Sequence, residues 1–281
     1  MKRGKSRRLF KKKKSHSNQR LGCIIAIIVL IPICYGLYLY YQQCSVQHNS
    51  KPQIETFVSL PTPSGKDLEI PVSLIPRQEQ IIRHKGYTVS YNKDLKIPNW
   101  VSYELTRQET KGKEKRGDNF IADPLVKGAI ATNADYARSG YDKGHMAPAA
   151  DMKWSPDVMK ESFYFSNMCP QHPQLNRRGW KNLEEKIRDW AVADSASIII
   201  CGPIIDKPSK TIGKNKVAVP ERFFKVILSP FVKPARGIGF LFNNRQAVEP
   251  LSTYAVSIDS IEKLTHMDFF SPLPDEIENA V

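Results

Sequence analysis

The chain has 281 residues, of which 41% are hydrophobic and 25% are charged, and this composition excludes a chain too polar to bury a core. A net charge of +14 is typical of nucleic-acid-binding proteins, but ten of the 42 Lys and Arg residues lie in residues 1–20, which contain no acid. The other 32 basic residues face 28 acidic ones, so most of the excess charge belongs to a tail rather than to a binding surface.

A membrane segment is predicted directly after the basic tail. Residues 21–41 contain no charged residue, and at about 1.5 Å per residue they would span roughly 30 Å, the thickness of a bilayer core. Tyrosines gather at the C-terminal end of the segment, where an interfacial aromatic belt would lie. The positive charge before the segment orients the N-terminus to the cytoplasm, so we expect a single-pass membrane protein whose C-terminal part is extracytoplasmic.

Two alternatives remain open for the N-terminal part. A cleaved signal peptide would have a shorter apolar region and a small-residue cleavage site, which "YYQQCSV" matches poorly, so an uncleaved signal-anchor is favoured. The tail could also bind nucleic acid or anionic lipid. The region after the membrane segment is rich in Pro, Ser, Gln and Thr and predicts a linker. We therefore expect a basic cytoplasmic tail (1–20), a transmembrane helix (21–41), a linker (42–77) and a folded domain (78–281).

The folded domain begins with a predicted strand pair. "YTVSY" (87–91) and "WVSYELT" (100–106) alternate apolar and polar residues, with a turn-forming stretch between them. Three short apolar runs predict further buried strands: "SASIIICGPII" (195–205), "RFFKVIL" (222–228) and "IGFLFNN" (238–244). Together with helical segments, these strands predict an α+β domain with a central antiparallel sheet flanked by helices.

Two helices are predicted in the same domain. The segment "SIDSIEKLTHM" begins with Ser257 as a helix cap and then places Ile258, Ile261 and Leu264 on one face. A second helix covers 176–191, and its core-facing stripe consists of Trp180, Leu183, Ile187 and Trp190. Extending this second helix backwards puts Asn176 among the apolar positions. A buried amide needs a partner, which could be a backbone group or a metal ion.

The stretch "YDKGHMAPAADMKW" (141–154) contains the most unusual polar residues. His145 is a base that is neutral near pH 7, and the glycine before it permits close backbone approach. The Asn176 oxygen suits Mg²⁺, which keeps several waters, and Glu184 could hold those waters. Arg188 and Lys143 add positive charge for an anionic substrate. Together these groups predict attack of water on a phosphodiester.

The same residues carry a resemblance to a known family. "DKGHMAPAADM" is similar to the D-R-G-H motif of the DNA/RNA non-specific endonuclease family, in the ββα-metal superfamily. "FSNMCPQHPQLNRRGWKNLEEKIRDW" resembles the S-N-x-x-P-Q…L-N…W…L-E…R pattern of that family. The segments "PNWVSYELT", "FIADP", "CGPI", "VPERFFKVIL" and "GFLF" also fit, in order, so the resemblance covers about 83–279. It implies a ββα-metal nuclease domain.

Residue roles follow from the resemblance position by position. It implies that His145 is the general base, that Asn176 is the sole direct protein ligand of Mg²⁺, and that Glu184 hydrogen-bonds metal-bound water. It further implies that Asn167 supports the catalytic site, while Arg188 and Arg116 contact phosphate, and that Asp142 anchors the loop. Lys143 stands where the family has arginine, which keeps the charge but loses the bidentate fork.

The implied activity is metal-dependent hydrolysis of DNA and/or RNA to 5′-phosphate ends, with Mg²⁺ or Mn²⁺ as cofactor. Sequence preference should be weak, because none of the candidate groups reads a base edge. Anchoring through residues 21–41 would keep such an enzyme away from cytoplasmic nucleic acid. Two other classes remain open: a catalytically weak nucleic-acid-binding module of the same fold, and a membrane-tethered scaffold protein.

Local alternatives also remain for individual residues. Asn176 could be a helix cap, and Glu184 with Arg188 could be an ordinary surface ion pair. Cys169 and Cys201 could form a disulfide in an exported domain or remain two buried thiols. A zinc site of these cysteines with His145 and His172 is disfavoured, since the sequence has no second close pair of ligands.

Overall fold

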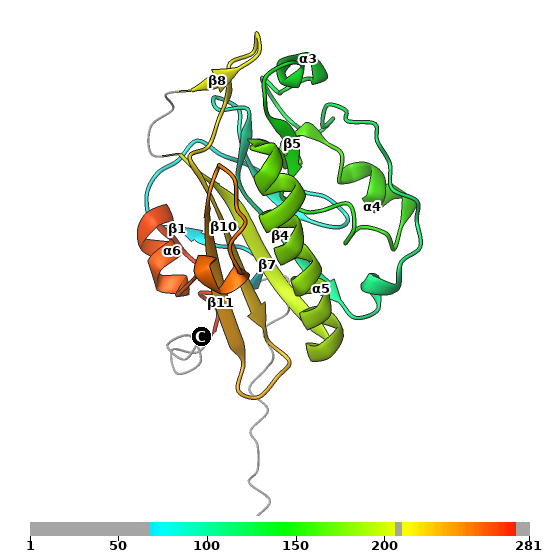
Figure 1. The fold of residues 1–281 in the computed structure, drawn as a ribbon, viewed down its shortest axis with the longest axis vertical. Coiled ribbons are helices and arrows are strands. Elements are labelled where there is room, and N and C mark those ends of the chain that lie inside the picture. Colours follow the sequence, from blue (N-terminus) through cyan, green and yellow to red (C-terminus); the bar gives the residue numbers. More distant parts are fainter. Residues whose placement is uncertain (1–67, 206–209, 274–281) are drawn as a thin grey trace, which may run out of the picture. The chain divides into compact units, whose positions relative to one another are not determined.

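The computed structural model describes residues 68–205 and 210–273 of the chain (Figure 1). These residues belong to a compact unit that covers Pro61–Val281. The predicted basic tail and the membrane segment 21–41 lie outside the described residues. Among the described residues, no helix is long and apolar enough to cross a bilayer.

Short helical turns and α-helices alternate with strands along the chain. The strands are β1 (Val72–Ser73), β2 (Gln80–Arg83), β3 (Thr88–Asn92), β4 (Ile97–Thr106), β5 (Asp142–His145), β6 (Met168–Gln171), β7 (Ala196–Ile204), β8 (Thr211–Ile212), β9 (Val217–Ala218), β10 (Arg222–Ser229), β11 (Arg236–Asn243), β12 (Ala255–Val256) and β13 (Met267–Asp268). The α-helices are α3 (Asn133–Tyr136), α4 (Pro156–Glu161), α5 (Lys181–Asp194) and α6 (Ile258–Thr265). The remaining helical turns are η1 (Glu109–Lys111), η2 (Phe165–Asn167), the π-helix η3 (Leu175–Trp180) and η4 (Leu251–Tyr254).

A seven-stranded sheet in the order β12-β11-β10-β7-β4-β3-β2 forms the centre of the domain, and all of its pairings are antiparallel. The predicted strand pair is therefore confirmed as β3 and β4, and the three later apolar runs are confirmed as β7, β10 and β11. The predicted α+β class with a central antiparallel sheet is also confirmed.

The sheet buries both of its faces, since side chains alternate between two cores along each strand. Ile199 of β7 and Phe223 of β10 belong to the core beneath α5, which also holds Trp180 and Leu183. Their neighbours Ile198, Ile200 and Phe224 belong to the core on the α6 side. Figure 1 shows α5 crossing one face of the sheet over β4 and β7. Near-continuous burial explains why these strands appear in the sequence as apolar runs.

The folded part begins earlier than the sequence predicts. Leu68 is only 1% exposed and packs in the core on the α6 side, and β1 pairs with β13. Residues 68–77, predicted as the end of the linker, therefore belong to the folded unit. A two-residue strand between prolines gives no periodic signal, so its pairing with the far end of the chain could not be read from the sequence.

Two helix predictions need correction in detail. Residues 175–180 form the wider π-helical turn η3, and α5 begins only at Lys181. A Cβ at Gly179 would lie 2.7 Å from the Cβ of Ala247, so this turn packs closely against the chain after β11. In α6, the Ser257 side chain accepts a hydrogen bond from the Ser260 backbone N–H, so the predicted cap is present. Leu264, which the sequence predicts on the apolar face with Ile258 and Ile261, is 39% exposed.

Candidate functional site

The hairpin of β5 and β6 leads through η3 into α5, and this ββα unit carries the candidate site (Figure 1). In the hairpin, Gly144 pairs with Cys169 and His145 pairs with Met168. A Cβ at Gly144 would collide with the side chain of Gln171, which is completely buried. The glycine before His145 is therefore required by close packing between the two strands.

His145 is held in an apolar niche. The residue is 7% exposed, and its ring lies 5.6 Å from the Phe120 ring and 5.0 Å from the Phe163 ring, measured between ring centroids. The buried Nε2 atom has no hydrogen-bond partner among the described residues. Burial, assisted by the nearby charge of Arg116, lowers the pKa of His145 to about 3. The imidazole is therefore neutral at pH 7 and can accept a proton.

The backbone around His145 is fixed by hydrogen bonds from two other elements. Trp180 Nε1 donates to the His145 carbonyl at 3.2 Å. Asn167 accepts from the Ala147 N–H at 2.8 Å and donates to the carbonyls of Ala147 and Ser162 at 2.9 Å each. The Asn167 amide is completely buried and fully engaged with backbone, so it positions the loop after His145 and is not available to touch a substrate.

Asn176 is tied to the same strand as His145. Its Nδ2 donates to Asp142 at 2.9 Å, and Asp142 also accepts two bonds from Arg177, at 2.8 Å each. Because a carboxylate only accepts hydrogen bonds, this contact turns the amide nitrogen towards Asp142 and leaves the Asn176 oxygen free for another group. Asp142 therefore anchors η3 to β5.

A divalent cation fits the oxygen that this arrangement leaves free. The Asn176 oxygen has no hydrogen-bond partner in the described part of the chain, and the same is true of the Glu184 carboxylate. Within residues 68–205 and 210–273, no three His, Cys, Asp or Glu side chains come together as a metal-binding group. The residues present thus fit a hard cation that keeps most of its waters, rather than zinc in a cysteine and histidine cage.

The two cysteines of the domain are both buried free thiols. Burial raises the pKa of Cys201 to about 11, and it also raises the pKa of Cys169 well above its ordinary value. Of the two alternatives that the sequence leaves open, unpaired thiols are therefore confirmed.

Arg188 forms an ion pair with the buried Asp151, a partner that the local sequence pattern gives no sign of. Arg188 Nη1 lies 2.7 Å from Asp151 Oδ1, and Tyr103 donates to Asp151 Oδ2 at 2.9 Å. No ion pair joins Arg188 to Glu184 in the described part, so the alternative of a simple surface pair is wrong. Asp151 is 1% exposed while the Arg188 side chain keeps 23% of its surface, so the carboxylate holds a guanidinium that still reaches the solvent.

Two further cations lie on the aromatic rings that surround His145. The Arg116 guanidinium lies 5.3 Å from the centre of the Phe163 ring. Lys143 Nζ lies 4.3 Å from the centre of the Phe120 ring and donates to Asn133 Oδ1 at 3.1 Å. The structure thus brings two of the three predicted phosphate-binding residues, Arg116 and Lys143, to the rings that contact the histidine. Phe120 and Phe163 are functional neighbours that the sequence pattern did not single out.

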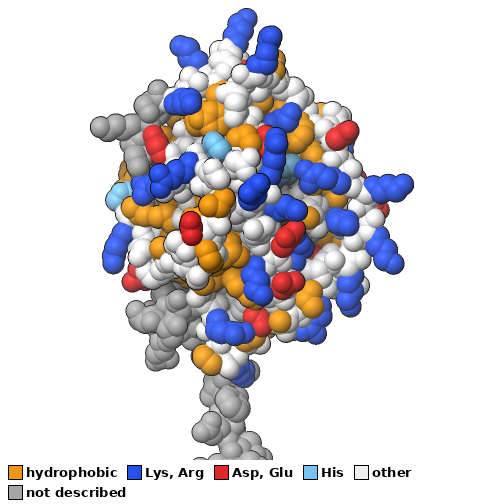
Figure 2. All heavy atoms as spheres, viewed as in Figure 1, with side chains coloured by type: hydrophobic (Ala, Val, Ile, Leu, Met, Phe, Trp, Pro, Cys, Tyr) orange, Lys and Arg blue, Asp and Glu red, His pale blue; other side chains and the backbone are white. Residues whose placement is uncertain are grey.

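Basic side chains outnumber acidic ones on the face that carries α5 (Figure 2). Several of those near the site are already paired. Arg177 bonds Asp142, Lys181 Nζ lies 3.4 Å from Glu185, and Lys186 lies 3.8 Å from Asp189. This part of the surface is therefore a mixed-charge face, and only a minor part of the binding energy for an anionic substrate should come from it.

Burial of the Glu184 carboxylate lowers the stability of the folded domain at neutral pH. Burial raises the pKa of Glu184 to about 7, opposed by the charges of Lys225, Arg188 and Arg116. Because the native carboxyl binds its proton more tightly than the unfolded one, its contribution to stability falls as the pH rises from about 4.5 to about 7.

We expect Glu184→Gln in metal-free buffer to be more stable than wild type at pH 8 by about 1–2 kcal/mol. The difference should shrink to about 0.4 kcal/mol at pH 4.5, where the native carboxyl is protonated and about half of the unfolded one is. Urea denaturation of both proteins at the two pH values measures it. A Gln variant less stable than wild type at pH 8 would mean that the ionised carboxylate is favourably bound.

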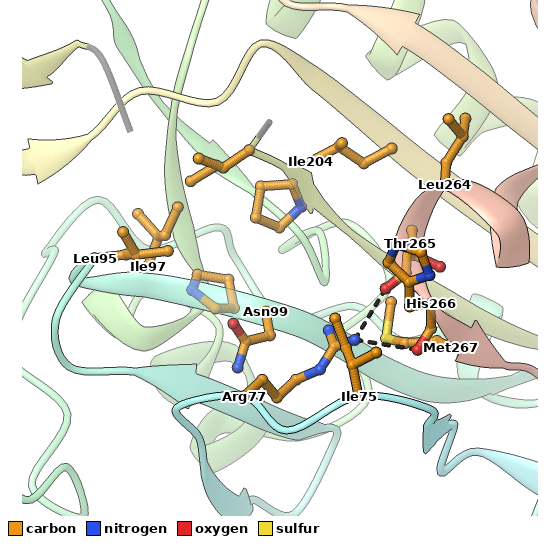
Figure 3. Close-up of a pocket in the computed structure, with 13 residues that line it drawn as sticks. Ile75, Arg77, Leu95, Ile97, Asn99, Ile204, Leu264, Thr265, His266 and Met267 are labelled. Atoms are coloured by element: carbon orange, nitrogen blue, oxygen red, sulfur yellow. Dashed lines mark hydrogen bonds between the residues drawn. The ribbon is translucent and has the colours of Figure 1, made fainter. Parts of the chain in front are cut away.

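The cavity in Figure 3 lies away from this site. It has a volume of about 230 Å³ and lies between the beginning of β4, the end of β7 and the end of α6. Arg77 on its wall donates to the carbonyls of Thr265 and His266 at the end of α6. None of the candidate site residues lines it.

Comparison with known proteins identifies the family of the chain. The family model described as DNA/RNA non-specific endonuclease matches residues 64–276. A nuclease from Nostoc sp. is 28% identical over 272 residues, which cover 92% of this chain and 96% of the relative. Human mitochondrial endonuclease G is 33% identical over 213 residues, which cover 69% of this chain and 71% of the relative.

A solved structure shares the fold as well as the sequence. The chain from the crystal structure of the EndoG/EndoGI complex, described as showing the mechanism of EndoG inhibition, superposes with a TM-score of 0.66 at 29% identity. The match covers 71% of this chain and 89% of that one. The chain therefore belongs to the DNA/RNA non-specific endonuclease family.

Proposed function

We propose that the chain is a metal-dependent endonuclease that hydrolyses phosphodiester bonds of DNA and/or RNA with little regard to sequence, leaving 5′-phosphate ends. The observation that carries this proposal is a neutral, clamped His145 on the strand whose Asp142 orients the Asn176 amide. Membership in a family of nucleic-acid-hydrolysing enzymes supports it.

In the proposed reaction, the neutral imidazole of His145 takes a proton from the attacking water. Asn176 would hold Mg²⁺, or Mn²⁺ in its place, and the bound ion supplies positive charge at the scissile phosphate. Glu184 would orient a water of that ion through its unpaired carboxylate.

The phosphate would be held by two cations beside the histidine and by Arg188. Arg116 and Lys143 lie on the rings of Phe163 and Phe120, and Arg188 is fixed by Asp151. Lys143 carries a compact charge rather than a planar fork, so phosphate would be held here by charge more than by bidentate geometry. None of these groups is placed to read a base, which supports cleavage without strict sequence preference.

A cleavage assay with and without metal tests the proposed function. The purified domain should nick and linearise plasmid DNA, or degrade RNA, in Mg²⁺ or Mn²⁺, and excess chelator should lower the rate by at least about 10²-fold. End-group analysis should find 5′-phosphates. Cleavage that persists undiminished in chelator would contradict the metal requirement. Binding of nucleic acid without any cleavage in either metal would favour a catalytically weak binding module.

We further propose that residues 21–41 anchor the chain in a membrane, with the nuclease domain on the extracytoplasmic side. The proposal is supported by ten basic residues before an uncharged stretch of bilayer length. Protease added to intact cells should remove the domain but leave the N-terminal tail protected. Protection of the domain in intact cells, with digestion only after lysis, would contradict this orientation.

A further inference from the structure

Lys225 is an ammonium group in the middle of an apolar core. It lies on β10, an interior strand of the seven-stranded sheet, and the residue is 0% exposed. Its neighbours on the same face of the strand, Phe223 and Ile227, are core residues beneath α5. Lysine is almost never fully buried unless its charge is compensated, so this position needs a physical reason.

The contacts of Lys225 lead directly to the candidate site. Its Nζ donates to the carbonyl of Met146 at 3.5 Å, immediately after His145 in the chain. Nζ also lies 4.4 Å from the centre of the Trp180 ring, and Trp180 in turn donates to the His145 carbonyl. Both peptide carbonyls at residues 145 and 146 are therefore held from beneath by one connected group of side chains.

The charge of Lys225 has no direct ion-pair partner among the described residues. No carboxylate oxygen of the described residues lies within ion-pair distance of Nζ. The buried cluster contains two carboxylates, Asp151 and Glu184, and two cations, Arg188 and Lys225. Arg188 is engaged with Asp151, which leaves Lys225 as the counter-charge for Glu184.

Glu184 is surrounded by groups from several elements. Lys225 approaches from β10, Arg188 from α5 and Arg116 from the loop after η1, and all three favour the ionised carboxylate. Asp151 opposes it. Tyr103 of β4 and Cys201 of β7 share the same buried cluster, and burial raises the pKa of both, so they stay neutral. Of these neighbours, Lys225 has the largest favourable effect on the Glu184 carboxylate.

We propose that Lys225 is a positioning residue for phosphodiester cleavage, which holds the Met146 carbonyl next to the general base and supplies a positive charge beneath Met146 and Trp180. The inference rests on the proposed function. Lys225 does not touch the substrate, because it lies beneath Met146 and Trp180, and it acts through His145 and Glu184.

Lys225→Met tests this role, since it keeps the length of the side chain and removes the charge. We expect kcat for cleavage to fall about 10- to 100-fold, with KM for nucleic acid within about twofold of wild type. The matched control is Ile227→Val, a core change on the same face of β10 without any change of charge, which should leave kcat within about twofold.

A double-mutant cycle with Glu184→Gln distinguishes positioning from a purely structural role. If Lys225 acts through Glu184, the double variant should be no slower than the slower single variant by more than about threefold. Circular dichroism and urea denaturation establish that each variant is folded. If Lys225→Met does not fold, Lys225→Gln also removes the charge and is held to the same criteria.

Several outcomes would overturn the inference separately from the proposed function. A folded, charge-free Lys225 variant with wild-type kcat, while His145→Ala is inactive, would refute the role of Lys225 and leave the nuclease proposal intact. Fully additive losses with Glu184→Gln would refute its action through Glu184. A wild-type protein that cleaves nothing in Mg²⁺ or Mn²⁺ would overturn both.

Discussion

Replacement of His145 by alanine should lower kcat for nucleic-acid cleavage by about 10²- to 10⁴-fold, the usual contribution of a positioned general base. The niche formed by Phe120 and Phe163 keeps the imidazole neutral, and alanine can accept no proton. Steady-state cleavage of a labelled oligonucleotide measures the effect. Affinity for nucleic acid should stay within about threefold of wild type, because the phosphate-binding cations are unchanged.

His84 provides the matched control for this experiment. It is also a histidine of the folded domain, and its Nε2 bonds the buried Asp123 at 2.9 Å, away from the candidate metal ligand. His84→Gln should keep most of the wild-type kcat even if it lowers stability. Equal cleavage by wild type and a folded His145→Ala would show that another group deprotonates the water.

Replacement of Arg188 by alanine should destabilise the folded domain by about 3–5 kcal/mol at pH 7, because it leaves the Asp151 carboxylate buried without a counter-ion. Burial already raises the pKa of Asp151, and Arg188 is the main group that opposes this rise. The pKa of Asp151 should therefore be still higher in the variant, so the loss of stability should shrink as the pH falls and the carboxyl becomes protonated. Urea denaturation between pH 4 and pH 8 measures both effects.

An exposed ion pair on the same helix supplies the reference. Lys181 and Glu185 are one turn apart on α5 and mostly solvated, so Lys181→Ala should change stability by no more than about 0.5 kcal/mol at any pH in this range. If Arg188→Ala proved as mild as Lys181→Ala, the Asp151 pair would not be buried in solution, and its role in holding a phosphate-binding arginine would fail.

Much of the fold could be predicted because the sheet is buried on both faces. Strands of this kind appear in sequence as short apolar runs bounded by turn residues, and β7, β10 and β11 were found in this way. The family motif likewise points to His145, Asn176 and Glu184, and their predicted roles stay predictions that the experiments above test.

Some residues of the site could not be predicted from the sequence, because their burial and pairing depend on contacts between distant segments. Lys225 lies in a strand pattern that an exposed lysine would also fit, and its burial is decided by Met146, 79 positions away. Asp151 follows an apolar run like an ordinary loop residue, yet it pairs with Arg188, 37 positions later. Local periodicity cannot report such pairs, because their partners come together only when the hairpin packs on the sheet.

The helical pattern was misleading in one place for a local reason. A wheel drawn with 3.6 residues per turn assumes that 176–191 is one regular helix, but η3 is a π-helical turn. The wider turn shifts Asn176 out of the apolar stripe. It lies half-buried against Asp142 rather than within the core.

Mn²⁺-induced broadening of the His145 imidazole signals in NMR spectra tests most directly whether a divalent cation bound at Asn176 lies beside the general base. In wild type, Mn²⁺ should broaden these signals, which are identified by their absence from the spectrum of His145→Ala. Asn176→Ala should need at least about tenfold more Mn²⁺ for the same broadening. Equal broadening in both proteins, or none in wild type under conditions that support cleavage, would contradict it.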